Sequence, residues 1–271
     1  PTWGNHHNIF RDAGLEVKGY SYFNADTCAV DFTGLSNDIM NAPEGSVFLF
    51  HACAHNPTGC DPTPAQWDEL SDLMKAKNHL TFFDCAYQGF ASGDSEIDAY
   101  SIRKFVSEGH NILLSQSFAK NFGLYGERVG TLSAVCADGE ETARVLSQFK
   151  ALIRAMYSNP PIYGARLIQE ILSDPALRQQ WTGECKAMAD RIIAMRHGLR
   201  GRLEQLGSQR DWQHITNQIG MFCFTGLTKD EVFKMRADYA IYCTEDGRIS
   251  MAGLTDNNLD YVAEAIHSVT K

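Results

Sequence analysis

A lysine with unusual neighbours stands in the segment QSFAKNFGLYGERVG, residues 116–130. Lys120 has serine, aromatic and small residues around it, and two glycines and Arg128 follow. A surface lysine usually has charged or polar neighbours, whereas a reactive lysine amine needs a partly desolvated pocket that lowers its pKa towards neutrality. The segment therefore favours a chemical site at Lys120, with a structural lysine as the alternative.

Asp84 ends the apolar run LTFF and is the second candidate. A carboxylate in such a place is desolvated, and its pKa is raised unless a cation or an N–H donor meets it. A helix N-cap is the alternative role. Tyr87 follows, and Arg128 and Arg248 taken singly are typical ion-pair residues. Together with Lys120 they supply an amine nucleophile, a carboxylate, a phenol and cations, the set that pyridoxal phosphate requires.

The segment HACAHNPTGCDP, residues 51–62, allows a different chemistry. If it is strand-like, His51, Cys53 and His55 share one face and could bind zinc. No fourth ligand of suitable type is nearby in the sequence, and a buried histidine bonded to a backbone carbonyl is commoner. Asn56 opens the turn signal NPTG, which a simple loop between a strand and a helix also explains. A zinc site is kept as the alternative.

Length and charge limit the class of protein. The chain of 271 residues has room for one large α/β domain with a smaller lobe. Its 24 Lys and Arg face 33 Asp and Glu, and the formal charge of −9 argues against a nucleic-acid or anionic-membrane surface. Its eight cysteines form no CxxC pair, which favours reduced thiols in an intracellular protein. No apolar run approaches the roughly 18 residues that span a bilayer.

The order of elements predicts where ligands bind. Strands are expected at residues 15–23, 46–52, 80–84, 112–117 and 129–135, and a helix at 63–78 with Thr63 and Pro64 in its first turn. Such alternation predicts a largely parallel sheet covered by helices, with ligands beyond the carboxyl ends of the strands. Three consecutive strand ends carry HACAHNPTG, DCAYQG and SFAK, and we expect them to meet at one crevice.

The second half predicts a smaller lobe. A long helical region should follow the turn at 158–161, break at Asp174 and Pro175, and resume from about Trp181 to Leu206. Short strands at WQHI, MFCFTG, YAIYC and RISMAG and a helix at about 256–269 predict an α+β arrangement. We therefore expect a large cofactor-binding domain at residues 1–187 and a small C-terminal domain at residues 188–271.

Seven motifs spread along the chain carry a resemblance: PTWGNH, HACAHNPTG, DCAYQGFASG, SFAKNFGLYGERVG, YSNPP, QIGMFCFTGL and GRISMAGLT. With them the chain resembles the class I aspartate aminotransferases of the fold-type-I pyridoxal-phosphate enzymes. PTWGNH, SFAKN and LIRAMYSNPP resemble most the mitochondrial isoenzyme. The resemblance implies a three-layer α/β fold whose N-terminal part, with a glycine-rich phosphate loop, lies upstream of Pro1. Because the chain begins with Pro1 and no signal peptide, we expect that this end was cut.

The resemblance also implies roles around the cofactor. Lys120 would bond covalently to the aldehyde of pyridoxal phosphate. Asp84 would meet the protonated ring nitrogen, with His6 supporting the carboxylate. Tyr87 and Asn56 would hydrogen-bond the phenolic oxygen of the ring.

The remaining roles concern the phosphate and the substrate. Ser117 and Arg128 would hold the phosphate, and Trp3 would stack on the ring and reach a substrate carboxylate. Arg248 would bind the substrate α-carboxylate, and Asn56 is also assigned to the substrate. The resemblance assigns the distal carboxylate of a neighbouring subunit's substrate to Arg154, with Ser158 and Asn159 nearby.

The activity implied is a ping-pong transfer of the amino group of L-aspartate to 2-oxoglutarate, which gives oxaloacetate and L-glutamate. The dicarboxylic amino acids and 2-oxo acids would bind at active sites shared within a homodimer. The compartment implied is the mitochondrial matrix, with the cytoplasm as the alternative. A catalytically silent fragment that acts by subunit association is a further alternative to the enzyme.

Overall fold

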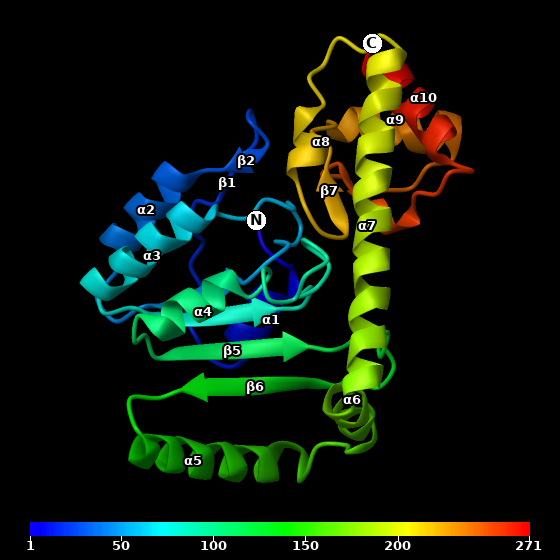
Figure 1. Ribbon diagram of the computed structural model, residues 1–271. Helices are drawn as coiled ribbons and strands as arrows, with labels where there is room; N and C mark the ends of the chain where they lie inside the picture. Colours follow the sequence, from blue (N-terminus) through cyan, green and yellow to red (C-terminus); the bar gives the residue numbers. More distant parts are fainter.

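A four-stranded sheet lies at the centre of the computed structural model, which describes residues 1–271 (Figure 1). Its order is β3-β4-β5-β6. The strands β3 (Val47–His51), β4 (Leu80–Cys85) and β5 (Ile112–Ser117) are parallel, and β6 (Gly130–Val135) runs antiparallel to β5. The predicted α/β fold with a mostly parallel sheet is therefore confirmed.

The register of this sheet brings the strand ends level. His51 pairs with Asp84, and Asp84 pairs with Ser115. Ser117 at the end of β5 pairs with Gly130 at the start of β6. The turn that connects β5 to β6 therefore returns to the same edge of the sheet, and it carries Lys120 and Arg128 there.

Apolar alternation along β4 explains how helices cover both faces of the sheet. On one face, Trp67 of α3 (Pro64–Ala76) contacts Phe83 and also Phe105 of α4 (Tyr100–Ser107). On the other face, Phe82 contacts Phe10 of α1 (Asn5–Asp12). The helix α2 (Phe32–Asn41) lies beside α3. The predicted start of α3 is confirmed, because Thr63 and Gln66 form a capping box.

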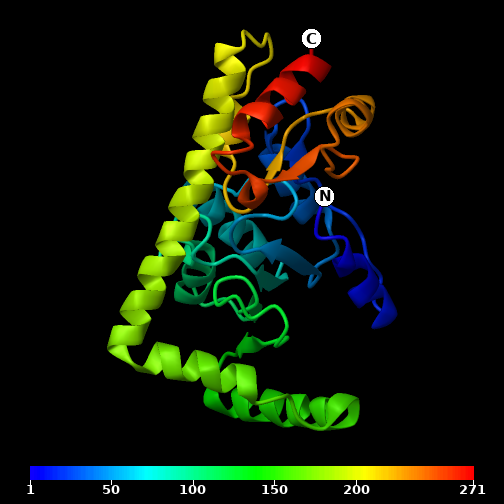
Figure 2. The same cartoon turned by 90° about the vertical axis from the view of Figure 1, so that its right-hand side faces the viewer.

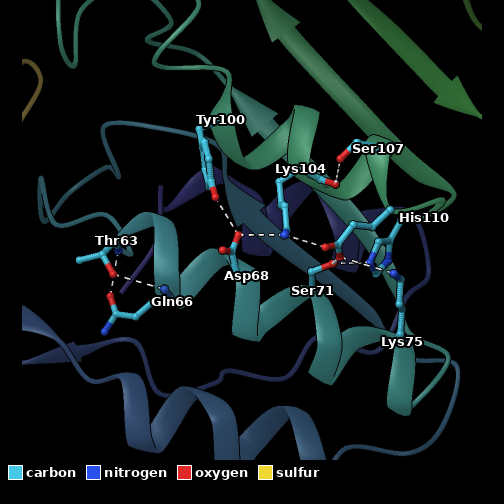
Figure 3. Close-up of polar contacts among 10 residues, drawn as sticks. Thr63, Gln66, Asp68, Ser71, Lys75, Tyr100, Lys104, Ser107 and His110 are labelled. Carbon is cyan, nitrogen blue, oxygen red and sulfur yellow. Dashed lines mark hydrogen bonds and ion pairs between the residues drawn. The ribbon is translucent and has the colours of Figure 1, made fainter.

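Polar side chains join α3 to α4 at the solvent side of this layer, as Figure 3 shows. Lys104 pairs with Asp68 at 3.2 Å and with Glu108 at 2.6 Å. Buried Ser71 contacts Glu108 and lies 2.7 Å from Nε2 of His110. Because a carboxylate only accepts, the Ser71 hydroxyl donates to Glu108 and accepts from the histidine. This cluster stabilises the helix layer, away from the strand ends that carry Asp84 and Lys120.

Three helices follow the sheet: α5 (Gly139–Tyr157), α6 (Tyr163–Ser173) and α7 (Pro175–Gln205). Figure 2 shows α7 running along the side of the whole molecule. The break at Asp174 is confirmed, but the expected restart near Trp181 is wrong. Asp174 accepts from the N–H groups of Ala176 and Leu177, so the helix restarts at once. α7 crosses residues 187–188 without a break, and the domain boundary placed there stays a prediction.

The C-terminal lobe holds five elements and a single turn of 3-10 helix at Met251–Gly253. The elements are α8 (Gln213–Asn217), β7 (Phe222–Phe224), α9 (Lys229–Tyr239), β8 (Arg248–Ser250) and α10 (Leu259–Val269). The strands predicted at MFCFTG and RISMAG are present as β7 and β8, and the two pair antiparallel. α8, α10 and the 3-10 turn pack against α7, and buried side chains such as Leu199 and Ile266 belong to one core that joins the lobe to the sheet.

Three predicted strands are wrong. WQHI lies at the start of α8, where Trp212 and Ile215 are buried at helical spacing. YAIYC leaves α9 through Ala240, which has a left-handed φ of 52° and forms no strand. The strand expected at 15–23 is reduced to β1 (Phe23–Asn24), which pairs only with β2 (Ala29–Val30). Residues 15–19 are exposed, and the hydroxyls of Tyr20 and Tyr22 donate to the carbonyl oxygens of Leu49 and Cys60.

The eight cysteines are free thiols. Among the helices, none has both the length and the apolar content that crossing a membrane requires.

Candidate active site

Asp84 lies at the end of β4 and is held by one histidine. Nε2 of His6 lies 2.9 Å from Oδ2 of Asp84, and both side chains are largely buried. The other carboxylate oxygen, Oδ1, has no hydrogen-bond partner within the chain. Asp84 is thus a carboxylate with one oxygen fixed and one oxygen able to accept a proton donor.

Thr2 extends this contact into a chain of hydrogen bonds that the sequence did not reveal. Its hydroxyl lies 2.9 Å from Nδ1 of His6 and 2.9 Å from Nε2 of His51. Because Asp84 only accepts, Nε2 of His6 donates to it, and the Thr2 hydroxyl links Nδ1 of His6 to Nε2 of His51. Nδ1 of His51 then accepts the N–H of Asn56 at 3.4 Å. Burial lowers the pKa of His51 to about 4, which keeps this ring neutral.

Lys120 follows β5 and faces the ring of Tyr87. Its Nζ lies 5.0 Å from the centre of that ring. Burial lowers the pKa of Lys120, and the nearby Arg128 lowers it further, while Asp84 opposes both. The turn is fixed from behind, because Trp181 donates from Nε1 to the carbonyl oxygen of Asn121 at 2.8 Å. The expected partly desolvated amine is present.

Asn56 connects two other candidates across the molecule. Its Nδ2 donates to the hydroxyl of Tyr87 at 3.4 Å, and its Oδ1 accepts from Arg248 at 3.0 Å. Phe222 of β7, which sequence reasoning did not single out, lies under the Arg248 guanidinium at 4.5 Å. Burial first, and then Asp84, raise the pKa of Tyr87 to about 12. Only one guanidinium nitrogen of Arg248 is engaged, so the others can bind an anion.

Three further candidates lie around this centre. The Arg128 guanidinium is exposed and donates to the carbonyl oxygen of Tyr125 at 2.9 Å. Ser117 accepts the N–H of Ala119 at 3.2 Å. Trp3 is 43% exposed and contacts His6 edge-on at 5.2 Å between ring centres, so one face of its indole is open.

The candidates Arg154, Ser158 and Asn159 are not brought to this group. Arg154 is exposed on α5 and hydrogen-bonds only Ser158 at the end of its own helix. Figure 1 shows α5 beyond β6, on the side of the sheet away from the C-terminal lobe that carries Arg248. Within one chain these residues cannot form a site with Arg248.

The zinc alternative at His51, Cys53 and His55 finds no support. The two imidazole rings lie 4.2 Å apart, but Nε2 of His51 is bonded to Thr2 and Nδ1 of His55 lies 2.8 Å from the hydroxyl of Thr58. Contact with Cys85 and burial raise the pKa of the Cys53 thiol far above its usual value, which disfavours the thiolate that zinc needs. No three His, Cys, Asp or Glu side chains in the chain are grouped so that they could hold a metal ion.

The group as assembled fits a ligand with an aldehyde, a basic ring nitrogen and an anionic substituent. Lys120 offers the amine for the aldehyde, the free oxygen of Asp84 can accept from a protonated ring nitrogen, and Arg128 offers a cation. At one edge of the sheet lie Lys120, Asp84, Tyr87, Asn56 and Arg248. This arrangement defines an α/β protein whose site is built around a lysine.

The family described as "Aminotransferase class I and II" matches residues 1–266, and the chain belongs to this family. The chain is 58% identical over 271 residues to the mitochondrial aspartate aminotransferases of Xenopus tropicalis and of Arabidopsis thaliana. These matches cover 100% of this chain but only 64% and 63% of the two relatives. The chain therefore spans a little under two thirds of the length of these relatives.

A solved structure gives the same result for the fold. The aromatic-amino-acid aminotransferase of Burkholderia pseudomallei, described as covalently bound to pyridoxal phosphate, matches with a TM-score of 0.99 and 44% identity. The match covers 100% of this chain and 68% of that one. The resemblance to the aminotransferase family is confirmed along the whole chain.

Proposed function

We propose that the complete protein containing this chain is a pyridoxal-phosphate-dependent aspartate aminotransferase. It transfers the amino group between L-aspartate and 2-oxoglutarate. The observation that carries this proposal is the position of Lys120, whose partly buried amine faces Tyr87 at the strand end next to Asp84. The membership of the family and the 58% identity to the mitochondrial relatives support the choice of reaction.

Each residue has a task that its surroundings suit. When bound, pyridoxal phosphate supplies an aldehyde and a protonated ring that withdraws electrons from the substrate Cα. Asp84, held by His6, would balance the charge on the ring nitrogen. Tyr87 and Asn56 would hold the phenolic oxygen, and Arg128 with Ser117 the phosphate. The open face of Trp3 would stack on the ring.

Lys120 would also move the proton. Because burial lowers its pKa, a larger fraction of the amine is unprotonated at neutral pH than for an exposed lysine. With cofactor and substrate bound, Nζ would accept the proton from the substrate Cα as a general base. Arg248 and Asn56 would hold the α-carboxylate, which fixes the orientation of that C–H bond.

The second carboxylate of a dicarboxylic substrate requires another cation, and we infer that Arg154 of a second copy supplies it. Its exposed position on α5, with Ser158 beside it, suits contact with another subunit. The proposed assembly is a homodimer with shared active sites. The mitochondrial matrix is the proposed compartment, because the relatives with 55–58% identity carry mitochondrial names. Fractionation of cells with antibody to the complete protein would test the location.

Covalent labelling tests the proposal directly. The complete protein mixed with pyridoxal phosphate should gain a near-ultraviolet band, and borohydride should then fix the cofactor on the peptide that contains Lys120. Lys120→Ala should abolish the label and the turnover of aspartate with 2-oxoglutarate. Lys186→Ala, which changes an exposed lysine paired with Asp190, is the control and should keep both. Label on another peptide contradicts the proposal. Absence of activity with saturating cofactor, together with the formation of oligomers, would favour the alternative of a catalytically silent fragment that acts by subunit association.

A further inference from the structure

Asn56 is the junction of the site, and its position decides how two functional groups meet. Its amide contacts Tyr87 on one side and Arg248, 192 residues later, on the other. Yet Asn56 lies beyond the end of β3, and the only sheet residue that binds its backbone N–H is His51, through a long contact of 3.4 Å to Nδ1. Something else must fix this turn.

A single carboxylate holds the backbone immediately before Asn56. Oδ2 of Asp61 accepts the N–H of Ala54 at 2.6 Å, and Oδ1 accepts the N–H of His55 at 2.8 Å. Ala54 has a φ of 49°, in the left-handed region that costs a residue with a Cβ about 1 kcal/mol. Two charge-assisted hydrogen bonds are enough to hold this conformation.

The C-terminal lobe packs closely against the same turn on its other side. A Cβ on Gly220, which itself has a φ of 80°, would lie only 2.5 Å from the Cβ of Ala54. Buried Arg196 of α7 donates to the carbonyl oxygens of Gly220, at 2.9 Å, and of Phe222, and so fixes the segment that leads into β7. The turn is therefore clamped between Asp61 and the lobe that carries Arg248.

We propose that Asp61 is a positioning residue for the substrate clamp: it holds the Ala54–His55 backbone so that Asn56 meets Arg248 and Tyr87 together. This inference rests on the proposed function, because the clamp is defined by the reaction. Asp61 touches neither substrate nor cofactor in this role. It acts only through the backbone that it binds.

Asp61→Asn tests this role with almost no change in shape. An asparagine has one oxygen acceptor, so one of the two N–H groups would face an NH₂ group and lose its partner. Loss of one such hydrogen bond in the complete protein should raise the KM for aspartate on the order of tenfold. The kcat should change much less, because Arg248 and Asn56 bind the carboxylate in both the ground state and the transition state. The pH midpoint of the bound cofactor's absorbance should move upward as Asn56 and Tyr87 lose their alignment.

Matched variants separate positioning from simple stability. Asp174 also accepts two backbone N–H groups, from Ala176 and Leu177, but at the start of α7, and Asp174→Asn should leave KM and midpoint unchanged. If Asp61→Asn does not fold, Ala54→Gly removes the cost of the left-handed φ, and the double variant should show the raised KM against Ala54→Gly alone.

The outcomes are distinct. A KM and a midpoint like those of the wild type overturn the positioning role, as does a loss of thermal stability without any change in the ratio of KM to kcat. Failure of the wild-type protein to take up cofactor on Lys120 would instead refute the proposed function.

Discussion

Arg248 and Arg154 are assigned to the two ends of the same proposed substrate, and the fold treats them in opposite ways. Arg248 lies over Phe222, is bonded to Asn56 and belongs to the group that contains Lys120. Arg154 lies on a helix with no buried residue and is bonded only to the neighbouring Ser158. One arginine is built into the chain, and the other is presented outward.

This difference shows which part of specificity a single chain can hold. The α-carboxylate, common to all amino acids, would be read by the interior arginine. The distal carboxylate, which distinguishes aspartate from aromatic substrates, would depend on a second copy.

Removal of the interior arginine should have the largest effect. Arg248→Leu takes away the cation and leaves Oδ1 of Asn56 without a donor, so kcat/KM should fall on the order of a thousandfold for aspartate and aromatic amino acids alike. Steady-state kinetics on the complete protein measures this. Arg103→Leu, in an exposed pair with Glu96, is the control. A loss confined to aspartate would refute the assignment of Arg248 to the α-carboxylate.

Arg154→Leu should have a smaller and selective effect. The kcat/KM for aspartate should fall on the order of a hundredfold, and that for phenylalanine should hardly change. Co-expression with Lys120→Ala should restore about a quarter of the wild-type turnover, because mixed dimers then hold one complete site. If mixing restores nothing, Arg154 does not act on a neighbouring subunit.

The histidine chain behind Asp84 predicts a dependence of stability on pH. The pKa of His51 is lowered by burial from 6.5 to about 4 in the folded state, so the unfolded state binds the proton first as pH falls. The free energy of unfolding should therefore decrease as pH drops from 6.5 to 4, by roughly 3 kcal/mol from this residue. His51→Gln should flatten the profile in urea unfolding, whereas exposed His7→Gln should not. An unchanged slope in His51→Gln contradicts the assignment.

The smallest effect concerns the support behind Lys120. Trp181→Phe keeps the stack on Phe122 but loses the hydrogen bond to Asn121, which should cost about 1 kcal/mol of stability. Trp212→Phe loses a comparable bond to Ser208 in the other lobe and should cost more, because Trp212 is buried and the smaller ring leaves a cavity. Only the first change should alter the pH midpoint of the cofactor absorbance. Equal midpoints would mean that Asn121 does not position Lys120.

The sequence predicted those parts that local chemistry determines. The parallel strands followed from short β-branched and aromatic runs, and the site followed from polar residues that stand where those runs end. The strand at YAIYC was wrong because tertiary packing, with α9 ending at Ala240, overrides an apolar run of that length. The role of Thr2 was invisible, because it depends on a contact with His51 from a different element.

The separation of Arg154 from Arg248 was likewise not predictable from the sequence. The resemblance assigned both to one substrate, and no property of the sequence shows that α5 points away from the lobe. Asp61 stands two residues after the turn signal NPTG, where its carboxylate could cap any nearby N–H. Its partners at Ala54 and His55 became visible only with the path of the turn.

The helix α7 has a consequence for how this protein can change in evolution. Near one end, Trp181 holds the turn of Lys120, and further along Arg191 donates to the carbonyl oxygens of Leu254 and Ala252, just after the strand of Arg248. The relative positions of the Lys120 amine and the Arg248 guanidinium therefore depend on the number of residues in one continuous helix. One inserted residue between these anchors would turn the lobe by about 100° about the helix. Surface loops of this protein can lengthen, but the number of residues between Trp181 and Arg191 in α7 must stay constant.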